Sequence, residues 1–311
     1  MDISAGEIED LNDPLIVDVR SPGEYREDHL PTAINLPVLN DAERDRIGTI
    51  YHQESEFKAR REGAKTICSN VPALIEALEE TVGSDDPILL YCWRGGQRSQ
   101  SLATILNRVG YNVYRLEGGY KAYRSRVNDF FQNADWDEPI VTLFGLTGAG
   151  KTTLLDHLDQ QGASTVDLEG AANHRGSAFG GIGLGDQPSQ KAFERRLYEE
   201  LRTASGPIYI EGESRKIGKR TIPDSLFEHL KKPPRVWVET DIDRRVTTIR
   251  NTYPWQDCED TLCESIEDLR ERLGGTRTDR LKAKLRDGEL NFVIRTLLEQ
   301  YYDPAYRKSS P

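Results

Sequence analysis

The eight residues Gly145–Thr152 constrain the fold of this chain more than any other stretch. They read G-x-x-x-x-G-K-T and stand between an apolar run, Ile140–Phe144, and a helical stretch that begins at Thr153. In such a strand, loop and helix, glycines let backbone N–H groups converge on a phosphate, Lys151 supplies a positive charge, and Thr152 can hold Mg²⁺. A purely structural glycine turn is the weaker alternative. The pattern therefore predicts a phosphate-binding loop in an α/β domain.

A second loop follows an apolar run in the first half of the chain. Pro87–Tyr91 leads into Cys92, and a helix-like stretch begins at Ser99. Backbone N–H groups in a tight loop, a helix N-terminus and nearby arginines all favour the thiolate. A buried structural cysteine is the alternative. We predict that Cys92 carries sulfur or selenium and that the loop holds an anion such as thiosulfate, selenite or a phosphate ester. The residues predicted to be catalytic are Cys92, Arg94 and Arg98, and those predicted to complete the anion loop are Gly95, Gly96, Gln97 and Ser99.

Short apolar strands alternate with helical stretches along the whole chain, which predicts mainly parallel α/β sheets with active loops at the carboxyl ends of the strands. A length of 311 residues favours two domains. We place an N-terminal parallel sheet with flanking helices at 1–127, a connector at 128–139, and a P-loop α/β domain with a helical, partly basic C-terminal region at 140–311. The expected strands are 15–19, 33–37, 87–91, 112–116, 140–144, 164–168, 207–210 and 235–239, and the clearest helices are 71–82 and 99–109.

Composition narrows the class of protein further. Charged residues make up 30% of the chain, no apolar run reaches membrane-spanning length, and the N-terminus lacks the apolar core of a signal peptide. The four cysteines form no CxxC pair, so we expect a cytoplasmic protein with free thiols, no membrane partner and no structural metal site. The net charge of −11 argues against bulk attraction to nucleic acid, but Arg270–Arg286 is locally basic. That stretch is either an RNA contact or a solvated helix face.

Two further loops follow expected strands of the second half. One holds His174 and Arg175, and the other holds Arg215 and Lys216. Cations at these positions are candidates for binding phosphate, although surface cations are common. In the second loop, Glu211 and Glu213 are candidates to position Mg²⁺ or to act as a base, and pairing with Arg215 is the alternative.

Several segments together carry a family resemblance. In the first half they are Val17–Pro22, His29–Pro37, the Cys92 loop and Leu116–Tyr120. This half resembles a rhodanese domain. Across the chain, the signatures are Asn40–Arg44, Gly48–Tyr51, the Cys92 loop, Gly145–Thr152, Ala172–Gly180 and Glu213–Gly218. In this order they resemble the tRNA 2-selenouridine synthase family.

The resemblance implies a two-step modification of wobble 2-thiouridine in tRNA. Geranyl diphosphate first alkylates the sulfur, and selenium from selenophosphate then displaces the S-geranyl group. Both compounds are co-substrates, no tightly bound cofactor is implied, Mg²⁺ is an option, and the enzyme that makes selenophosphate is a candidate partner. Cys92 would carry the selenium as a selenopersulfide or take part in the displacement at C2. The residues expected to bind the diphosphate are Gly148, Gly150, Lys151, Thr152 and Thr153, while His174, Arg175, Arg215 and Lys216 would contact tRNA or the diphosphate.

Other expectations concern the apolar and aromatic residues of the second half. Phe179–Leu184 is a candidate wall for the geranyl chain, and a mobile glycine-rich flap is the alternative. Tyr301, Tyr302 and Tyr306 could stack on anticodon-loop bases, but packing in the protein core is favoured.

Three rival functions remain open from the sequence. The main alternative is a rhodanese-type sulfurtransferase with a nucleotide-binding regulatory domain, which would act on thiosulfate without tRNA. A kinase-like or nucleotide-hydrolysing enzyme would turn over ATP. A non-catalytic tRNA-binding protein is disfavoured, because the Cys92 loop and the phosphate loop are both intact.

Overall fold

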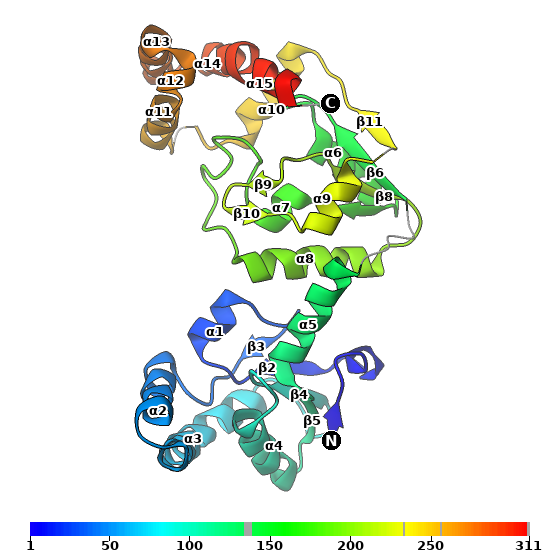
Figure 1. The fold of residues 1–311 in the computed structure, drawn as a ribbon, viewed down its shortest axis with the longest axis vertical. Coiled ribbons are helices and arrows are strands. Elements are labelled where there is room, and N and C mark those ends of the chain that lie inside the picture. Colours follow the sequence, from blue (N-terminus) through cyan, green and yellow to red (C-terminus); the bar gives the residue numbers. More distant parts are fainter. Residues whose placement is uncertain (134–138, 233, 256, 310–311) are drawn as a thin grey trace. The chain divides into compact units, whose positions relative to one another are not determined.

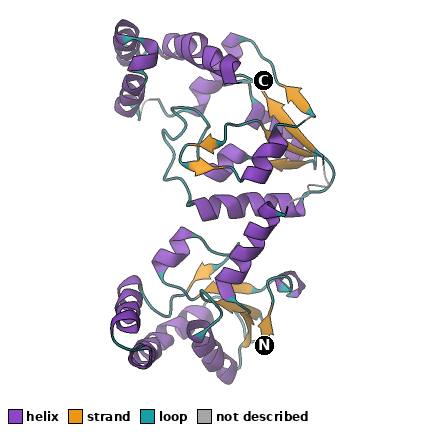
Figure 2. Cartoon of the chain, in the orientation of Figure 1, coloured by secondary structure: helices purple, strands orange, loops and turns teal. Residues whose placement is uncertain are grey.

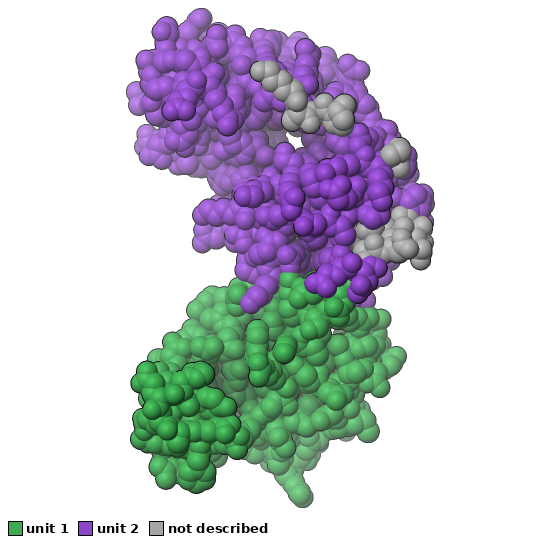
Figure 3. Space-filling model, viewed as in Figure 1, with its two compact units in different colours: residues 1–130 green, residues 131–311 purple. Residues whose placement is uncertain are grey.

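The computed structural model describes residues 1–133, 139–232, 234–255 and 257–309. The chain divides into two compact units, Met1–Phe130 and Phe131–Pro311 (Figure 3). Each unit is an α/β structure with its own parallel sheet (Figures 1 and 2). This confirms the fold class predicted from the sequence.

Part of the expected connector is helical. Helix α5 (Gly119–Gln132) continues beyond residue 128, where we expected the connector to begin. Val127 and Phe131 extend an apolar face at helical spacing, and both side chains are buried, so helix formation continues to the end of that face. Residues 134–138 of the expected connector lie outside the described residues.

The sheet of the first unit has the strand order β1-β5-β4-β2-β3. All of its strand pairs are parallel, and β4 lies at the centre. The side chains of Ile88, Leu89 and Leu90 in β4 are fully buried, as expected for a parallel sheet that is covered on both faces. The strands are β1 (Asp2–Ile3), β2 (Leu15–Asp18), β3 (Ile34–Asn35), β4 (Pro87–Tyr91) and β5 (Asn112–Leu116).

Helices α3 and α4 pack on one face of this sheet. Leu78 of α3 and Leu102 of α4 share a buried core with Ile88 and Leu90. The sequence predicted only residues 71–82 of α3. The helix is longer because its polar first half also buries one stripe, which includes Ala59 and Ile67. The elements around the sheet are the 3₁₀ turn η1 (Ile8–Asp10) and helices α1 (Pro22–Glu27), α2 (Asp41–Gln53), α3 (Glu56–Glu79), α4 (Gln97–Val109) and α5.

The second unit contains a four-stranded sheet of order β11-β6-β8-β7. All of its pairs are parallel, and the phosphate loop follows β6. The strands β7 and β11 are shorter than predicted. The strands are β6 (Ile140–Phe144), β7 (Ser164–Val166), β8 (Ile208–Glu211) and β11 (Arg235–Trp237), and the helices near them are α6 (Lys151–Gln160), α7 (Leu168–Ala172), α8 (Gln190–Thr203) and α9 (Asp224–Leu230). A separate antiparallel pair consists of β9 (Lys216–Ile217) and β10 (Arg220–Thr221).

A helical layer completes the second unit. Its apolar faces form a core that includes Leu262, Val293 and Leu297. No helix in the described ranges is long and apolar enough to cross a membrane. The layer consists of α10 (Ile242–Thr252), α11 (Glu259–Asp268), α12 (Arg270–Leu273), α13 (Gly275–Arg286), α14 (Leu290–Leu297), the π-helical turn η2 (Leu298–Tyr302) and α15 (Asp303–Ser309).

Part of the basic stretch 270–286 is ion-paired within this layer. Arg270 and Lys282 both pair with Glu267, and Lys284 pairs with Glu289. These contacts fit a solvated, ion-paired helix face for Arg270, Lys282 and Lys284, and the RNA contact stays a prediction for the other cations of the stretch.

A buried ion pair stabilises the first unit at the end of strand β2. Arg20 and Asp18 are 1% and 0% exposed, and the Arg20 Nη2 atom lies 2.6 Å from Asp18 Oδ2. The same guanidinium donates to the carbonyl of Asp28 and lies over the ring of Tyr120, whose hydroxyl donates to the Asp28 carboxylate. The arginine therefore ties β2 to the start of α5.

Replacing Arg20 by methionine (Arg20→Met) should lower the free energy of unfolding of the first unit by about 3 to 5 kcal/mol, because it leaves Asp18 buried without its counter-ion. Urea denaturation of the full chain, followed by circular dichroism, measures the change. The matched control is Arg26→Met, which removes an exposed ion pair with Asp41 and should cost less than about 1 kcal/mol. Equal losses in the two variants would contradict the prediction.

Candidate functional site

Cys92 lies directly after the buried strand β4, as predicted. The residue is 3% exposed. Its Sγ accepts a hydrogen bond from the Ser99 hydroxyl at 3.3 Å and lies 3.8 Å from the carbonyl oxygen of Gly96. Helix α4 begins at Gln97, two residues earlier than predicted, so its N-terminus lies closer to the loop. Free N–H groups at a helix N-terminus favour an anion there.

The turn before α5 holds the Cys92 loop in shape. The N–H groups of Tyr120 and Lys121 donate to the carbonyls of Cys92 and Trp93, at 2.9 and 3.0 Å. Gly119 has a φ of 59°, and a Cβ atom there would lie 2.2 Å from the carbonyl oxygen of Cys92. Only glycine allows the two backbones to approach this closely. The glycine pair at 118–119 therefore supports the shape of the Cys92 loop.

The two arginines of the loop differ in their surroundings. Arg98 makes a two-pronged contact with Glu24, at 2.7 and 3.3 Å, and Arg44 lies 3.6 Å from the same carboxylate. Burial alone would raise the pKa of Glu24, but the hydrogen bonds and charge of Arg98 bring it below its ordinary value. In the described part of the chain, Arg94 makes no ion pair and is exposed. Arg94 is therefore the loop arginine that is available to an incoming anion.

Glu24 and Arg44 were not among the residues predicted for this site. Glu24 stands 74 positions from Arg98 in the sequence, so no local pattern connects them. The family resemblance was the sequence signal that could have pointed to these two residues. Arg44 belongs to the signature Asn40–Arg44, and Glu24 lies just after the first signature.

The phosphate loop of the second unit has the expected shape. Gly148 and Gly150 have φ values of 78° and 89°, which only glycine adopts readily. Helix α6 begins at Lys151, whose Nζ donates to the carbonyl of Gly145 at 3.4 Å and lies 3.8 Å from Glu213 Oε1. The loop borders a cleft of about 940 Å³, which lies within the second unit. The predicted diphosphate-binding residues that line it are Gly148, Gly150, Lys151, Thr152 and Thr153.

Three carboxylates surround the lysine of the phosphate loop. Burial, and then their mutual repulsion, raises the pKa of Glu169 to about 8 and the pKa of Glu211 well above its ordinary value. Glu213 is also shifted upward, mainly by burial. Burial would lower the pKa of Lys151, but the charges of Glu213 and Glu169 raise it, so the lysine stays charged.

The four other predicted cations separate into two groups. His174, Arg175 and Arg215 line the same cleft as the phosphate loop, while Lys216 is exposed on β9, outside the residues that line it. Arg175 donates to the carbonyl of Ile182 at 2.8 Å and lies over the ring of Tyr253. His174 packs against Gly180, and burial, aided by the charge of Arg175, lowers its pKa. Arg215 pairs with Asp224 on the exposed side of the cleft.

A small apolar cavity opens next to the phosphate loop and was not predicted as a whole. Its volume is about 40 Å³, and it shares Thr147, Ile249 and Tyr302 with the wall of the larger cleft. From the predicted prenyl wall, Phe179 lines this cavity and Leu184 lines the cleft, while Ile182 is buried in the helical core. Ser177 and Tyr253 also line both the cavity and the cleft. The remaining residues that line the cavity are Trp255, Leu262, Ile266, Val293, Ile294, Leu297 and Leu298.

The tyrosines near the end of the chain pack against the protein, as the sequence analysis favoured. The ring of Tyr302 closes the boundary between the cavity and the cleft. The hydroxyl of Tyr306 accepts a hydrogen bond from the N–H of Gly145 at 3.3 Å. The end of the chain therefore forms part of the phosphate-loop site.

The two sites define a protein with a rhodanese-like unit and a P-loop unit on one chain. A family model described as a rhodanese-like domain matches residues 4–126, and one described as the tRNA 2-selenouridine synthase AAA domain matches residues 138–310. Proteins named tRNA 2-selenouridine synthase from Pseudomonas syringae pv. syringae and Marinobacter nauticus are 35% and 34% identical to it, and each match covers 95% of this chain and 88% of the relative. The chain belongs to the tRNA 2-selenouridine synthase family, which confirms the resemblance seen in its motifs.

The buried carboxylates of the cleft predict a specific pH dependence of stability. These carboxyl groups have raised pKa values in the folded protein. The folded protein therefore keeps their protons at pH values where the unfolded chain has already released them. Their contribution to the free energy of unfolding therefore falls as the pH rises from about 5 to about 8. Replacing Glu211, which is fully buried, by glutamine (Glu211→Gln) should remove part of this loss. Relative to the natural chain, the variant should have a larger stability gain at pH 8 than at pH 5.

Thermal unfolding of both proteins at the two pH values measures this difference. Glu228→Gln is the matched control, because Glu228 is exposed and Lys231 lowers its pKa through a hydrogen bond. The control should show no gain that grows with pH. A Glu211→Gln gain that is constant or shrinks between the two pH values would contradict the raised pKa.

Proposed function

We propose that this chain is a transferase that converts wobble 2-thiouridine in tRNA to 2-selenouridine. Membership of the tRNA 2-selenouridine synthase family supports the overall reaction. The presence of two separate anion sites, one with a cysteine and one with a phosphate loop, supports a reaction in two steps. The first step is S-geranylation from geranyl diphosphate, and the second is replacement of the S-geranyl group by selenium from selenophosphate.

In the first step, the phosphate loop would bind the diphosphate of geranyl diphosphate. The thiouridine sulfur forms a bond to C1 of the geranyl group as the C1–O bond breaks and its electron pair leaves with the diphosphate. Lys151 and the N–H groups at the start of α6 stabilise that developing charge. The N3 proton of the thiouridine must leave as well, and Glu169 lies in the same cleft with a pKa of about 8, close enough to neutral pH to accept it.

The observation that carries this assignment is the apolar cavity beside the phosphate loop. A nucleotide offers phosphates and a polar sugar, whereas a prenyl diphosphate offers phosphates and a purely apolar chain. Thr147, Ile249 and Tyr302 border both the phosphate cleft and the cavity, so one ligand can place its head in the first and direct its chain toward the second. The cavity is smaller than a geranyl chain, so binding would move Tyr302 and widen it.

Magnesium has a plausible place in this step. Among the described residues, no group of three or more His, Cys, Asp and Glu side chains is arranged to hold a metal ion. The Thr152 hydroxyl at the start of α6 and the diphosphate oxygens would therefore be its ligands, as oxygen donors suit this hard cation. Bound there, Mg²⁺ would neutralise charge on the leaving diphosphate.

In the second step, Cys92 would act at C2 of the S-geranylated base. Its thiolate adds to C2 and expels geranylthiolate. The selenium of selenophosphate, held by Arg94 and the loop amides, then displaces Cys92, and water splits the Se–P bond to release phosphate. This route is balanced without an oxidant. A selenopersulfide formed from a thiolate and selenophosphate would require a two-electron oxidation, so the displacement role of Cys92 is the one we propose. The enzyme that supplies selenophosphate remains a predicted partner.

Separate substitutions in the two sites should separate the two steps. Cys92→Ser should lower the rate of selenation by at least about a thousandfold, because it removes the nucleophile, and should leave geranylation unchanged. Lys151→Ala should lower geranylation by about a hundredfold or more and leave selenation of previously geranylated tRNA unchanged. Mass spectrometry of nucleosides, after incubation with tRNA and each co-substrate omitted in turn, measures both products.

The result that would overturn the assignment of the phosphate loop is tight binding of a nonhydrolysable ATP analogue together with weak binding of geranyl thiodiphosphate. Activity on thiosulfate and cyanide without any requirement for tRNA would instead favour the sulfurtransferase alternative. Failure of the natural chain to produce selenouridine with all components present would reject the proposal as a whole.

The cavity itself can be tested by filling it. Val293 is fully buried and lines the cavity. Val293→Phe should raise the KM for geranyl diphosphate at least about tenfold, at a cost of about 1 to 3 kcal/mol in stability from overpacking. Selenation of previously geranylated tRNA should not change. The control is Leu281→Phe, a buried residue of the same helical core that does not line the cavity. Equal effects of both substitutions on KM would contradict the cavity assignment.

A further inference from the structure

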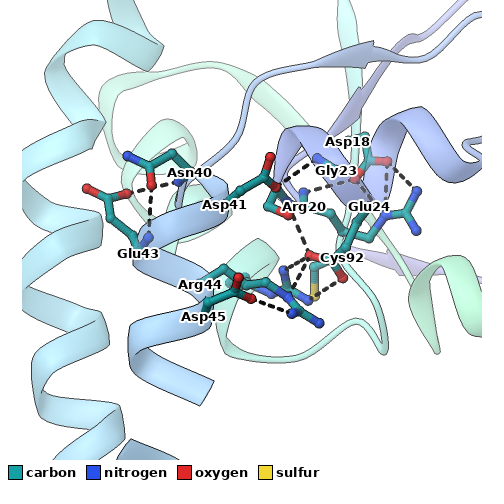
Figure 4. Close-up of polar contacts among 12 residues, drawn as sticks. Asp18, Arg20, Gly23, Glu24, Asn40, Asp41, Glu43, Arg44, Asp45 and Cys92 are labelled. Atoms are coloured by element: carbon teal, nitrogen blue, oxygen red, sulfur yellow. Dashed lines mark hydrogen bonds and ion pairs between the residues drawn. The ribbon is translucent and has the colours of Figure 1, made fainter. Parts of the chain in front are cut away.

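One face of helix α2 runs alongside the Cys92 loop. Arg44, Gly48 and Tyr51 are spaced at i, i+4 and i+7, so they form one stripe on the helix. At one end, Arg44 lies 3.6 Å from Glu24, the carboxylate that holds Arg98 (Figure 4). We call Arg44, Gly48 and Tyr51 the α2 stripe.

The other end of the α2 stripe lies near the exposed arginine of the loop. The hydrogen bond and charge of Glu56 raise the pKa of Tyr51, and the positive charges of Arg60 and Arg94 oppose that rise. The charge of Arg94 thus acts on the Tyr51 phenol. The geometric link to the Cys92 loop is at the opposite end of the stripe, where Arg44 contacts the carboxylate that holds Arg98, and Gly48, the middle residue, lies one helical turn from Arg44.

That middle residue is a glycine without a structural reason inside the described protein. Glycine in a helix interior is destabilising relative to alanine. Gly48 does not have a positive φ, and a Cβ atom placed on it would meet no atom within 4 Å. Neither backbone conformation nor packing therefore requires glycine here. Its remaining effect is to leave the helix backbone open to close approach by another molecule.

Tyr51 offers a fixed aromatic surface beside this opening. The side chain is 48% exposed, although its hydroxyl donates to Glu56 Oε1 at 2.9 Å. This hydrogen bond and an edge-on contact with the ring of His52 hold the tyrosine ring in one orientation. A ring held in this way lies one turn from the bare backbone of Gly48. Arg44, which is exposed and contacts Glu24 and Asp45, lies one further turn along the same stripe. This arrangement matches a flat ligand that carries negative charge at its edges.

We propose that the α2 stripe binds one unpaired nucleobase of the RNA substrate next to Cys92. The base stacks on Tyr51, the sugar lies over Gly48, and the adjoining phosphates contact Arg44 and Arg94. Stacking on aromatic rings, combined with arginine contacts to phosphate, is the general way in which proteins hold single-stranded RNA. A net charge of −11 argues against bulk attraction to RNA, so local cationic sites such as this one would supply the attraction. The inference rests on the proposed function, since it assumes that tRNA is the substrate.

Two leucine substitutions separate binding from folding. Gly48→Leu adds a side chain into the open space, and leucine is a better helix former than glycine, so the thermal midpoint should not fall. The KM for an S-geranylated anticodon stem-loop in the selenation reaction should rise at least about tenfold. Thr49→Leu is the matched control, because Thr49 is exposed on the same turn but lies off the stripe. The control should leave this KM unchanged.

Two tyrosine substitutions test the stacking. Tyr51→Phe keeps the ring and should keep KM within about twofold, whereas Tyr51→Ser should raise it about tenfold, the usual effect of losing one base–aromatic stack. Selenophosphate is kept saturating, and its own KM is measured in parallel. If Gly48→Leu and Tyr51→Ser both retain the natural KM for RNA, or raise only the KM for selenophosphate, the inference is wrong. If the natural chain makes no selenouridine, the proposed function fails instead.

Discussion

The buried parallel strands β4 and β6 determine where this chain can perform chemistry. Within β4, the side chains of Ile88 to Tyr91 are fully buried and the backbone polar groups are used in the sheet. Backbone N–H groups become available to a ligand only beyond the last ladder bond. Cys92 follows β4 directly, and Gly145 follows β6 directly. Both predicted anion sites therefore arise from the same constraint, which is the point at which a buried strand leaves its sheet and a helix begins.

In both sites, a carboxylate of the protein contacts a cationic side chain for which the sequence analysis predicted ligand binding. Glu24 holds Arg98, and Glu213 lies 3.8 Å from Lys151. The consequences differ between the units. The Glu24–Arg98 contact is two-pronged and the pKa of Glu24 is lowered, so this pair is part of the scaffold and an anion must use Arg94 and the loop amides. Around Lys151 the pKa of Glu213 is raised, so under the proposed function this carboxylate can take up a proton as a diphosphate approaches and leave the lysine to the ligand.

The sequence was most informative where chemistry depends on neighbouring residues. The Cys92 loop and the phosphate loop are continuous segments, and their glycines, cysteine and lysine lie as the spacing predicted. It was least informative where chemistry depends on distant residues. Glu24 and Arg98 are 74 positions apart, and Gly145 and Tyr306 are 161 apart. The apolar cavity could not be predicted because it forms between the faces of α10, α11 and α14, and each face alone shows only that a helix is amphipathic. The first half of α3 was missed for a related reason, since its buried stripe is narrow and lies among charged residues.

The chemistry of sulfur explains why the proposed reaction needs two sites with such different walls. A thiocarbonyl sulfur is a poor leaving group, but its alkylated form can leave as a thiolate. Alkylation by a prenyl diphosphate requires a phosphate loop and an apolar surface, and in the second unit Thr147, Ile249 and Tyr302 border both. Displacement by selenophosphate requires neither an apolar surface nor a further activated phosphate. It needs a nucleophile, a small anion loop and a way to hold the base, which are the roles that we propose for Cys92 and the residues around it. The two steps therefore need different surfaces. The second unit, with its apolar cavity, would first activate the sulfur, and the first unit, with its polar loop, would then replace it.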